Sequence, residues 1–450
     1  MKSGLSARSE SNDFIKAWYS KTNSVTGHIK SVIDDRRFFI IAMVVSSVWI
    51  LWETASGDMW GDLNHYYKNA GDVLSGLVPY SEMAFEYPPL SLLFMLIPRI
   101  LSWNLESFYY CCAIQTYIFI TIGTYVLLRI ADDFIGCRWQ THLILILFLL
   151  FGGYFVIARN DVYPAVFAII AFWMYLKDRH VLAFAIMAVA AMIKMYPAIF
   201  LIPMVIPFIM KGDWRKTIVC VLSAAVVCLI VELPFLITDP STAFAYLTYH
   251  SDRGIQVESV VGSFFMLYNI LIPGDLTVVF GYGSDNLSGV GPDALAPYMN
   301  SIMAVVLMLF IIVMIIRIHN TVSLDKLGPY VVLISMTMLM LFITFSKVYS
   351  AQYIIWIMLL LPLTQMSCFD SRCRMEVLAA MIPFGIFSVC SYVGYNSFGL
   401  PELDTFAVIL TSLKNIFHIL LTIVLLRMCW IETSGSERGS DLETVCKVTS

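Results

Sequence analysis

The sequence predicts an all-α polytopic membrane protein with about twelve transmembrane helices. Of its 450 residues, 59% are hydrophobic and only 13% are charged, whereas a soluble domain carries about 25% charged residues. The mean hydropathy is +0.79. Apolar stretches follow one another with short polar breaks between them. Because such a surface cannot face water on all sides, these observations exclude a soluble enzyme.

The chain divides into three predicted parts. Residues 1–37 are polar, contain seven Lys and Arg residues and form a cytoplasmic N-terminal segment. This long basic lead favours an uncleaved anchor over a signal peptide. Residues 38–428 form the transmembrane domain, with outer loops at 55–107 and 238–298. Residues 429–450 are rich in Ser, Glu and Gly and are predicted to be a disordered cytoplasmic tail.

Near-continuous apolar windows predict the crossings. If each window crosses once from a cytoplasmic N-terminus, most of the 28 Lys and Arg residues fall inside, as the positive-inside rule requires. Counting residues 88–103 as a span would reverse this distribution, so that segment is predicted to be a re-entrant or interfacial helix. The windows are 38–54, 108–130, 141–157, 162–177, 181–195, 197–210, 216–237, 299–317, 328–345, 351–366, 375–395 and 405–428.

Polar clusters interrupt the apolar pattern at four predicted outer helix ends. A charge at membrane depth costs several kcal/mol unless it is paired or hydrated, so repeated charges at one level indicate a cavity. For any single Lys or Arg, the alternative is that a side chain at a helix end reaches out to the membrane surface. The candidate residues in these clusters are Arg159, Asp161, Lys194, Tyr196, His250, Arg253, Lys347 and Gln352.

The first outer loop adds a candidate acid. Asp62 follows the first span directly, where its carboxylate could take a proton from a hydroxyl nucleophile. The alternative is an N-cap for the helix predicted at about 63–74. Asp58, four residues earlier, is a second candidate. Tyr66, Glu86 and Tyr87 are further candidates for substrate contact in this loop.

Acids beside cations suit a reaction in which a hydroxyl attacks and a phosphate leaves, because one group takes the proton and the others stabilise the leaving oxygen. The predicted inner loops are about four to twelve residues long, too short for a nucleotide-binding domain, and they lack phosphate-loop spacings. A sugar donor would therefore arrive on a membrane-embedded phosphate carrier. The net charge of −4 excludes nucleic acid as an expected partner, and no metal-ligand spacing such as paired CxxC occurs.

The order of these motifs over about residues 38–366 resembles the polytopic GT-C glycosyltransferases. The nearest match is to the polyprenol-phosphate-mannose-dependent α-mannosyltransferases of prokaryotes, with the first GPI mannosyltransferase a more distant likeness. The residues that carry the resemblance are Asp62, Tyr66, Ala70, Gly76, Pro79-Tyr80, Tyr87-Pro88-Pro89-Leu90, Arg159-Asn160-Asp161, Lys194-Met195-Tyr196-Pro197, Pro203, Lys347 and Gln352-Tyr353.

The resemblance implies an inverting transfer of a hexose, with mannose expected, from a polyprenyl phosphate to a lipid-linked or cell-surface glycan. It places the active site on the extracytoplasmic face, and we expect the plasma membrane. Asp62 would be the general base. The GPI relatives carry an Asp-x-Asp pair that Asp62-Leu63-Asn64 lacks, which weakens a metal-dependent mechanism, although a divalent cation stays open.

The resemblance also implies roles for the remaining candidate residues. Arg159, Lys194 and Lys347 would hold the donor phosphate. Asp161, Tyr196 and Gln352 would orient sugar hydroxyls. His250 and Arg253 are chosen from their charge and side of the membrane alone.

Two other classes of function stay open. A ligase or polymerase of lipid-linked glycans would share the outer face and would depend more on Arg253 and His250 than on Asp62. A secondary transporter is the main rival outside the enzymes, but transporters place charges near the midplane and often show two related halves. The predicted partners are membrane lipids, the donor lipid and a glycan or glycolipid acceptor.

Overall fold

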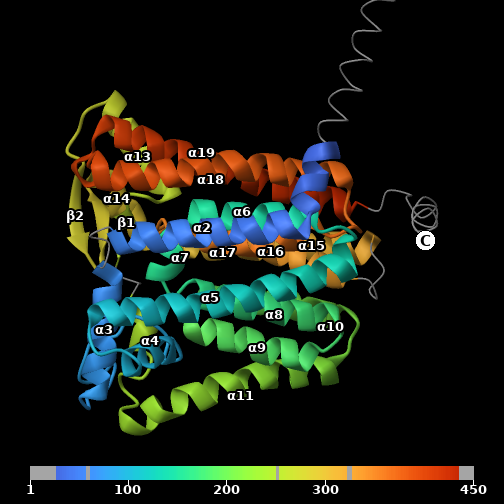
Figure 1. The fold of residues 1–450 in the computed structure, drawn as a ribbon, viewed down its shortest axis with the longest axis horizontal. Helices are drawn as coiled ribbons and strands as arrows, with labels where there is room; N and C mark the ends of the chain where they lie inside the picture. The colour runs from blue at the N-terminus through green and yellow to red at the C-terminus, as the bar shows by residue number, and fades with distance from the viewer. Residues whose placement is uncertain (1–26, 57–60, 250–252, 322–326, 435–450) are drawn as a thin grey trace, which may run out of the picture.

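The computed structural model describes residues 27–56, 61–249, 253–321 and 327–434. Long helices lie roughly side by side along one direction (Figure 1). Within these described ranges, six helices are long and apolar enough to cross a bilayer: Leu105–Ile135, Trp214–Thr238, Val290–His319, Gly328–Phe345, Ser371–Ser397 and Thr405–Glu432. Further apolar helices of 10–17 residues pack among them. The prediction of an all-α polytopic membrane protein is confirmed, while the count of twelve crossings stays a prediction.

The helices and strands follow the chain in this order: α2 (Arg36–Ser56), α3 (Gly61–Leu74), α4 (Ser91–Ile100), α5 (Leu105–Ile130), the π-helix η1 (Ala131–Ile135), α6 (Trp139–Gly152), α7 (Phe155–Ala158), α8 (Val162–Leu176), α9 (His180–Ile193), η2 (Tyr196–Phe200), α10 (Leu201–Met210), α11 (Trp214–Thr238), α12 (Ala245–Tyr249), β1 (Ile255–Gln256), α13 (Val260–Leu271), β2 (Thr277–Gly281), β3 (Ser284–Ser288), α14 (Val290–Leu295), η3 (Ala296–Tyr298), α15 (Met299–Thr321), α16 (Gly328–Phe345), α17 (Tyr353–Leu360), η5 (Leu361–Gln365), α18 (Ser371–Ser397), η6 (Leu400–Glu402) and α19 (Thr405–Glu432).

Each of the twelve predicted windows falls on one or two of these helices. Residues 88–103 contain α4, which has ten residues and an internal Pro98. A helix of ten residues is about 15 Å long, half the thickness of the hydrocarbon core. It therefore cannot cross alone, as the charge distribution predicted. The last helix, α19, continues to Glu432, four residues beyond the predicted end of the transmembrane domain.

One end of the bundle carries the irregular structure. The helices α3 and α4 gather there with a small sheet and with α13 and α14, at the left of Figure 1, and we call this the α3 end. The antiparallel sheet has the strand order β1-β3-β2. Tyr282 and Gly283 join β2 to β3 with φ angles of 53° and 69°. Positive φ at both positions is typical of a two-residue hairpin turn.

The sequence predicted residues 238–298 only as an outer loop, and the structure shows that this segment contains the sheet and α13. The strands are short, and one of the two longer ones, Ser284–Ser288, is polar. They give little of the hydrophobic alternation by which a strand is recognised.

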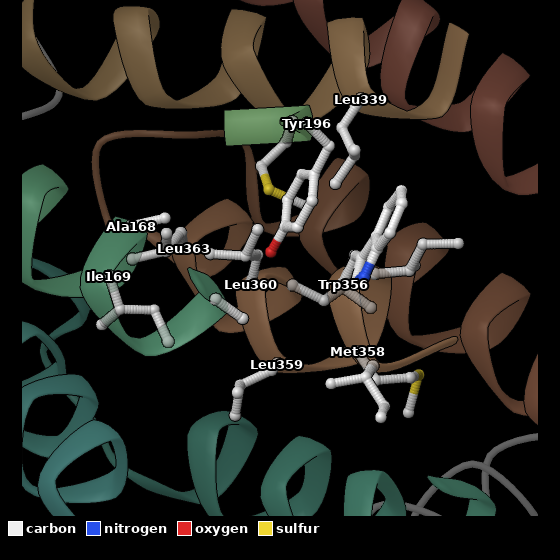
Figure 2. Packing of buried hydrophobic residues seen from close by; sticks show 14 of the residues in the cluster. Ala168, Ile169, Tyr196, Leu339, Trp356, Met358, Leu359, Leu360 and Leu363 are labelled. Carbon is white, nitrogen blue, oxygen red and sulfur yellow. The ribbon is translucent and has the colours of Figure 1, made fainter. Parts of the chain in front are cut away.

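The centre of the bundle is apolar, and it holds α17. Residues Ile354–Leu360 are all buried, and Figure 2 shows several of them packed with Ala168 and Ile169 of α8 and with Leu339 of α16. A helix that is hydrophobic all round is surrounded by other helices. Because α17 begins at Tyr353, this rigid element fixes the polar segment Ser346–Gln352 that precedes it.

Candidate active site

A cavity of about 700 Å³ lies at the α3 end of the bundle. Its wall is formed by α3, the segment before α17, the sheet and the ends of α7 and α9. It brings together most of the residues predicted from the sequence, namely Asp62, Glu86, Tyr87, Arg159, Lys194, Tyr196, Arg253, Lys347 and Gln352.

A second hollow, of about 670 Å³, lies on α5. Leu51, Ile114, Ile118, Ile122 and neighbouring apolar, Tyr and Thr side chains line it, without a charged group. It offers no acid, base or cation for chemistry. The polar cavity is therefore the candidate active site.

Asp62 and Arg159 form an ion pair in the cavity. The Oδ2 atom of Asp62 lies 2.6 Å from Nη2 of Arg159, and the two side chains are 32% and 22% exposed. Arg159 has an extended backbone just after α7, which turns its side chain out of the helix. Asp62 is the second residue of α3, so it is not the N-cap of that helix, and the N-cap alternative is wrong.

The surroundings set the proton affinity of Asp62. Burial raises the pKa of its carboxyl group above the usual value, and the positive charge of Arg159 opposes this shift. The negative charge of Glu86 raises the pKa further, while Lys194 and His65 lower it. A carboxylate with a raised pKa accepts a proton more readily than an exposed Asp does.

Lys194 lies on the cavity wall and is held from behind by Asp161. Nζ of Lys194 donates to Oδ1 of Asp161 over 2.6 Å. The Asp161 side chain is fully buried, while that of Lys194 is 20% exposed. The indole N–H of Trp356 also donates to Oδ1. Asp161 is not among the residues that line the cavity, so its position fits a role in orienting Lys194 rather than the predicted contact with sugar hydroxyls.

Tyr196 lines the cavity, but its hydroxyl points away from it. The ring stacks on Trp356 with 4.1 Å between ring centroids, and Trp356 stacks on Tyr353 with 3.7 Å. In Figure 2 the Tyr196 hydroxyl points into the apolar cluster near Leu360 and Leu363, and this oxygen has no hydrogen-bond partner among the described residues. The predicted contact of the Tyr196 hydroxyl with a sugar therefore does not fit this orientation.

The segment Ser346–Gln352 supplies Lys347 and Gln352 to the cavity. Lys347 is 4% exposed. Its carbonyl accepts a hydrogen bond of 2.9 Å from the backbone N–H of Gln256. The Oε1 atom of Gln256 accepts a bond of 3.0 Å from the N–H of Tyr349. These bonds join the segment to the β1 region, so the backbone that carries Lys347 is fixed at two points.

Arg253 and Glu86 face each other across the cavity wall. Nη2 of Arg253 lies 4.0 Å from Oε2 of Glu86, and Arg253 also donates to the carbonyl of Tyr282 in the β2–β3 turn. Tyr87 lines the cavity, whereas Tyr66 is buried behind it, edge-on to the Tyr87 ring with 5.8 Å between centroids. Tyr66 thus supports the site from the core.

Two predicted candidates lie outside the described residues: His250, and the second acid, Asp58.

Two carboxylates on the wall, Glu258 and Asp285, were missed from the sequence. Glu258 lies between β1 and α13 and is 7% exposed. Burial raises the pKa of Glu258, and the charges of Lys414 and Arg159 oppose this shift. Asp285 accepts a hydrogen bond from the hydroxyl of Tyr395. An available signal was that Glu258 stands five residues after Arg253, in the same predicted outer loop.

Opposite charges balance on this wall. Among the described residues that line it, four are acidic and four are Lys or Arg. Two of these cations, Arg159 and Arg253, already face wall carboxylates. No group of three or more His, Cys, Asp or Glu suited to a metal ion occurs in the described part of the chain.

Comparison with known proteins adds one match. The model of glycosyltransferase family 87 matches residues 85–344, more than half of the chain. The matched segment includes Arg159, Lys194 and Glu258; Asp62 precedes it and Lys347 follows it. No curated protein matches the sequence.

Proposed function

The chain belongs to glycosyltransferase family 87 and is a multi-pass membrane glycosyltransferase; from that premise, we propose that it moves a hexose, with mannose expected, from a polyprenyl phosphate to a lipid-linked or cell-surface glycan. The reaction would take place on the extracytoplasmic face of the plasma membrane. Membership of this family sets aside the transporter alternative.

The observation that carries the proposal is the ion pair of Asp62 with Arg159 inside a cavity that Lys194 and Lys347 also line. In the proposed reaction, an acceptor hydroxyl oxygen attacks the anomeric carbon of the donor sugar, and Asp62 takes the hydroxyl proton. The bond between the anomeric carbon and the phosphate oxygen breaks, and its electron pair leaves on the phosphate. A single displacement of this kind inverts the anomeric configuration.

Cations stabilise the charge that develops on the leaving oxygen. Arg159 and Lys347 are our candidates for that contact, with Lys194 beside them. Arg159 offers several N–H donors in a planar fork, which suits a phosphate as well as a carboxylate. It can therefore bind the donor phosphate and Asp62 in turn or together, which would place the base next to the reacting bond.

Short connections between helices support a lipid-linked donor. The connections 177–179, between α8 and α9, and 211–213, between α10 and α11, are three residues long each and are predicted to be cytoplasmic. A nucleotide-binding βαβ unit needs about 30 residues or more. A donor that is already in the membrane needs no such unit, because its phosphate can enter the cavity from the bilayer.

The decisive experiment is Asp62→Asn in purified protein, assayed with synthetic polyprenyl-phosphate mannose and its glucose counterpart. Because the amide cannot take the proton, we expect kcat to fall about 10²- to 10⁴-fold with little change in KM for the donor. Asp72→Asn is the matched control, since Asp72 lies on the same helix and does not line the cavity. Full activity in Asp62→Asn would remove the proposed base, and a wild-type protein inactive with both polyprenyl-phosphate sugars would contradict the proposed donor.

A further inference from the structure

Glu258 is fixed in the cavity wall by residues from the last helix. The carbonyl of Glu258 accepts a hydrogen bond of 3.0 Å from Nζ of Lys414 and one of 3.2 Å from Nδ2 of Asn415. Nδ2 of Asn415 also donates to the carbonyl of Ser259 and to Oγ of Ser263, over 3.0 and 2.7 Å. Lys414 and Asn415 are each 2% exposed, and α19 runs beside α13 (Figure 1). A charged Lys buried within an apolar helix is costly, so this arrangement indicates a function rather than packing alone.

The carboxylate of Glu258 has a different kind of partner from the carboxylates of Asp62 and Glu86. Its Oε2 atom accepts a bond of 3.1 Å from Nε2 of Gln256, a neutral amide. Asp62 and Glu86, in contrast, face Arg159 and Arg253. In the described part of the chain, no ion pair within 4.0 Å involves Glu258. An ionised carboxylate can accept about four hydrogen bonds, so Glu258 keeps acceptor capacity for a ligand.

The chemistry of the surroundings selects the ligand. A phosphate would be repelled by a second anion, whereas neighbouring hydroxyls of a hexose can donate to the two oxygens of one carboxylate. Tyr353 and Trp356 line the same cavity, but their rings stack on each other and Trp356 also stacks on Tyr196, so the sugar contact rests on the free acceptor capacity of the carboxylate. The site therefore fits a carbohydrate ring.

The position of Glu258 relative to Lys347 favours the donor sugar. Gln256, which contacts the Glu258 carboxylate, donates its backbone N–H to the carbonyl of Lys347. Its Nε2 also lies 3.3 Å from Oγ of Ser350. The backbone of Lys347 is thus joined to the residue that contacts the Glu258 carboxylate, and both Lys347 and Glu258 line the cavity.

We propose that Glu258 binds the donor by accepting hydrogen bonds from two neighbouring hydroxyls of its hexose, and that Lys414 and Asn415 are positioning residues that hold Glu258 for this contact. The proposal rests on the proposed function, because it takes the polyprenyl-phosphate sugar as the donor. It assigns recognition of the sugar to a residue apart from the base and from the phosphate contacts.

The test compares two ligands on the purified full-length protein: a polyprenyl-phosphate hexose and the bare polyprenyl phosphate, with affinities measured by microscale thermophoresis. The wild-type protein should prefer the sugar-bearing lipid. In Glu258→Gln the preference should fall about tenfold, since a hydrogen bond to a charged group is lost, while affinity for the bare lipid is kept. Glu258→Asp keeps the charge but shortens the reach, and it should lose the preference too even if Glu258→Gln fails to fold.

Controls separate recognition from general damage. Glu106→Gln makes the same change of charge on an exposed residue that does not line the cavity, and its preference should stay at the wild-type value. Lys414→Met should lower the preference, and Lys414→Arg, which can still donate to the Glu258 carbonyl, should restore part of it. A loss of fold alone would lower affinity for both lipids and leave their ratio unchanged.

Three outcomes would overturn the proposal. An unchanged preference in both Glu258 variants would show that Glu258 does not contact the donor sugar. If the Glu258 variants showed a raised KM for the acceptor but kept the wild-type preference for the sugar-bearing lipid, Glu258 would bind the acceptor instead. A wild-type protein that binds neither lipid would overturn the proposed function as well, whereas the first two outcomes leave the proposed function intact.

Discussion

The buried ion pair of Lys194 and Asp161 allows an effect on stability to be distinguished from an effect on donor binding. Asp161 is fully buried, and Lys194 is the cation that contacts its carboxylate, over 2.6 Å. Replacing Lys194 with Met keeps the length of the side chain but removes its charge. The Asp161 carboxylate would then be left with the N–H of Trp356 as its described donor.

The expected cost follows from the burial. Removing one partner of a buried ion pair costs about 3–5 kcal/mol, because the remaining charge is left without compensation. With an unfolding entropy of about 2 cal/mol/K per residue, a chain of 450 residues would melt about 3–5 °C earlier. Asp161→Asn should cost less, since the Lys194 side chain is 20% exposed and can be hydrated from the cavity.

The double variant Lys194→Met with Asp161→Asn completes a thermodynamic cycle. Removing both charges leaves no isolated ion, so most of the lost stability should return. Melting can be followed in detergent with a thiol-reactive dye, because Cys112, Cys220, Cys373 and Cys429 are buried in the folded protein.

Two results would refute this reasoning. Lys194→Met could melt at the wild-type temperature, or the double variant could melt no higher than Lys194→Met. Activity then gives a second answer: if Lys194 also holds the donor phosphate, the double variant should recover its melting temperature but not its affinity for the donor.

Two further predictions concern pH and packing. Because burial raises the pKa of Asp62, lowering the pH should reduce activity at a higher pH than it would for an exposed Asp. Arg159→Gln removes the positive charge that opposes this shift, so the acid limb of the pH–rate profile should move to a still higher pH. An unmoved acid limb would contradict the pairing of Asp62 with Arg159. A Cβ atom at Gly385 would lie 2.1 Å from Cδ2 of Phe151. Gly385→Ala should therefore destabilise the protein by about 1–3 kcal/mol. Gly394→Ala in the same helix meets its nearest atom at 3.4 Å and should melt close to wild type; equal melting of the two variants would disprove the close contact.

The sequence could predict the helices and part of the site because both depend on local patterns. A run of apolar residues long enough to enter a bilayer forms a helix whatever its neighbours are, since every backbone group must be paired within it. Arg159 and Lys194 stand out for the same reason. Each interrupts an apolar run, and each has an extended backbone directly after a helix, which directs its side chain to the cavity.

Pairings between distant segments were not predictable in this way. Asp161 stands two residues after Arg159, so the sequence grouped them as contacts of one substrate. The structure turns Asp161 inward to Lys194 and Trp356, which are 33 and 195 residues away. Glu258 is held by Lys414 across 156 residues. No local spacing encodes such a contact, because it arises only when α19 packs beside the segment that contains Glu258.

The charge balance of the cavity bears on the order of events in the proposed reaction. Asp62 lies 2.6 Å from Arg159, so in this state the proposed base is held by a cation that the donor phosphate would also contact. When the phosphate binds Arg159, it neutralises the positive charge that lowers the pKa of Asp62. Burial, which raises that pKa, is then less opposed. The affinity of Asp62 for a proton then rises at the point where the acceptor hydroxyl must lose one. Donor binding would thereby prepare the base, and an acceptor that entered first would meet a carboxylate still occupied by Arg159.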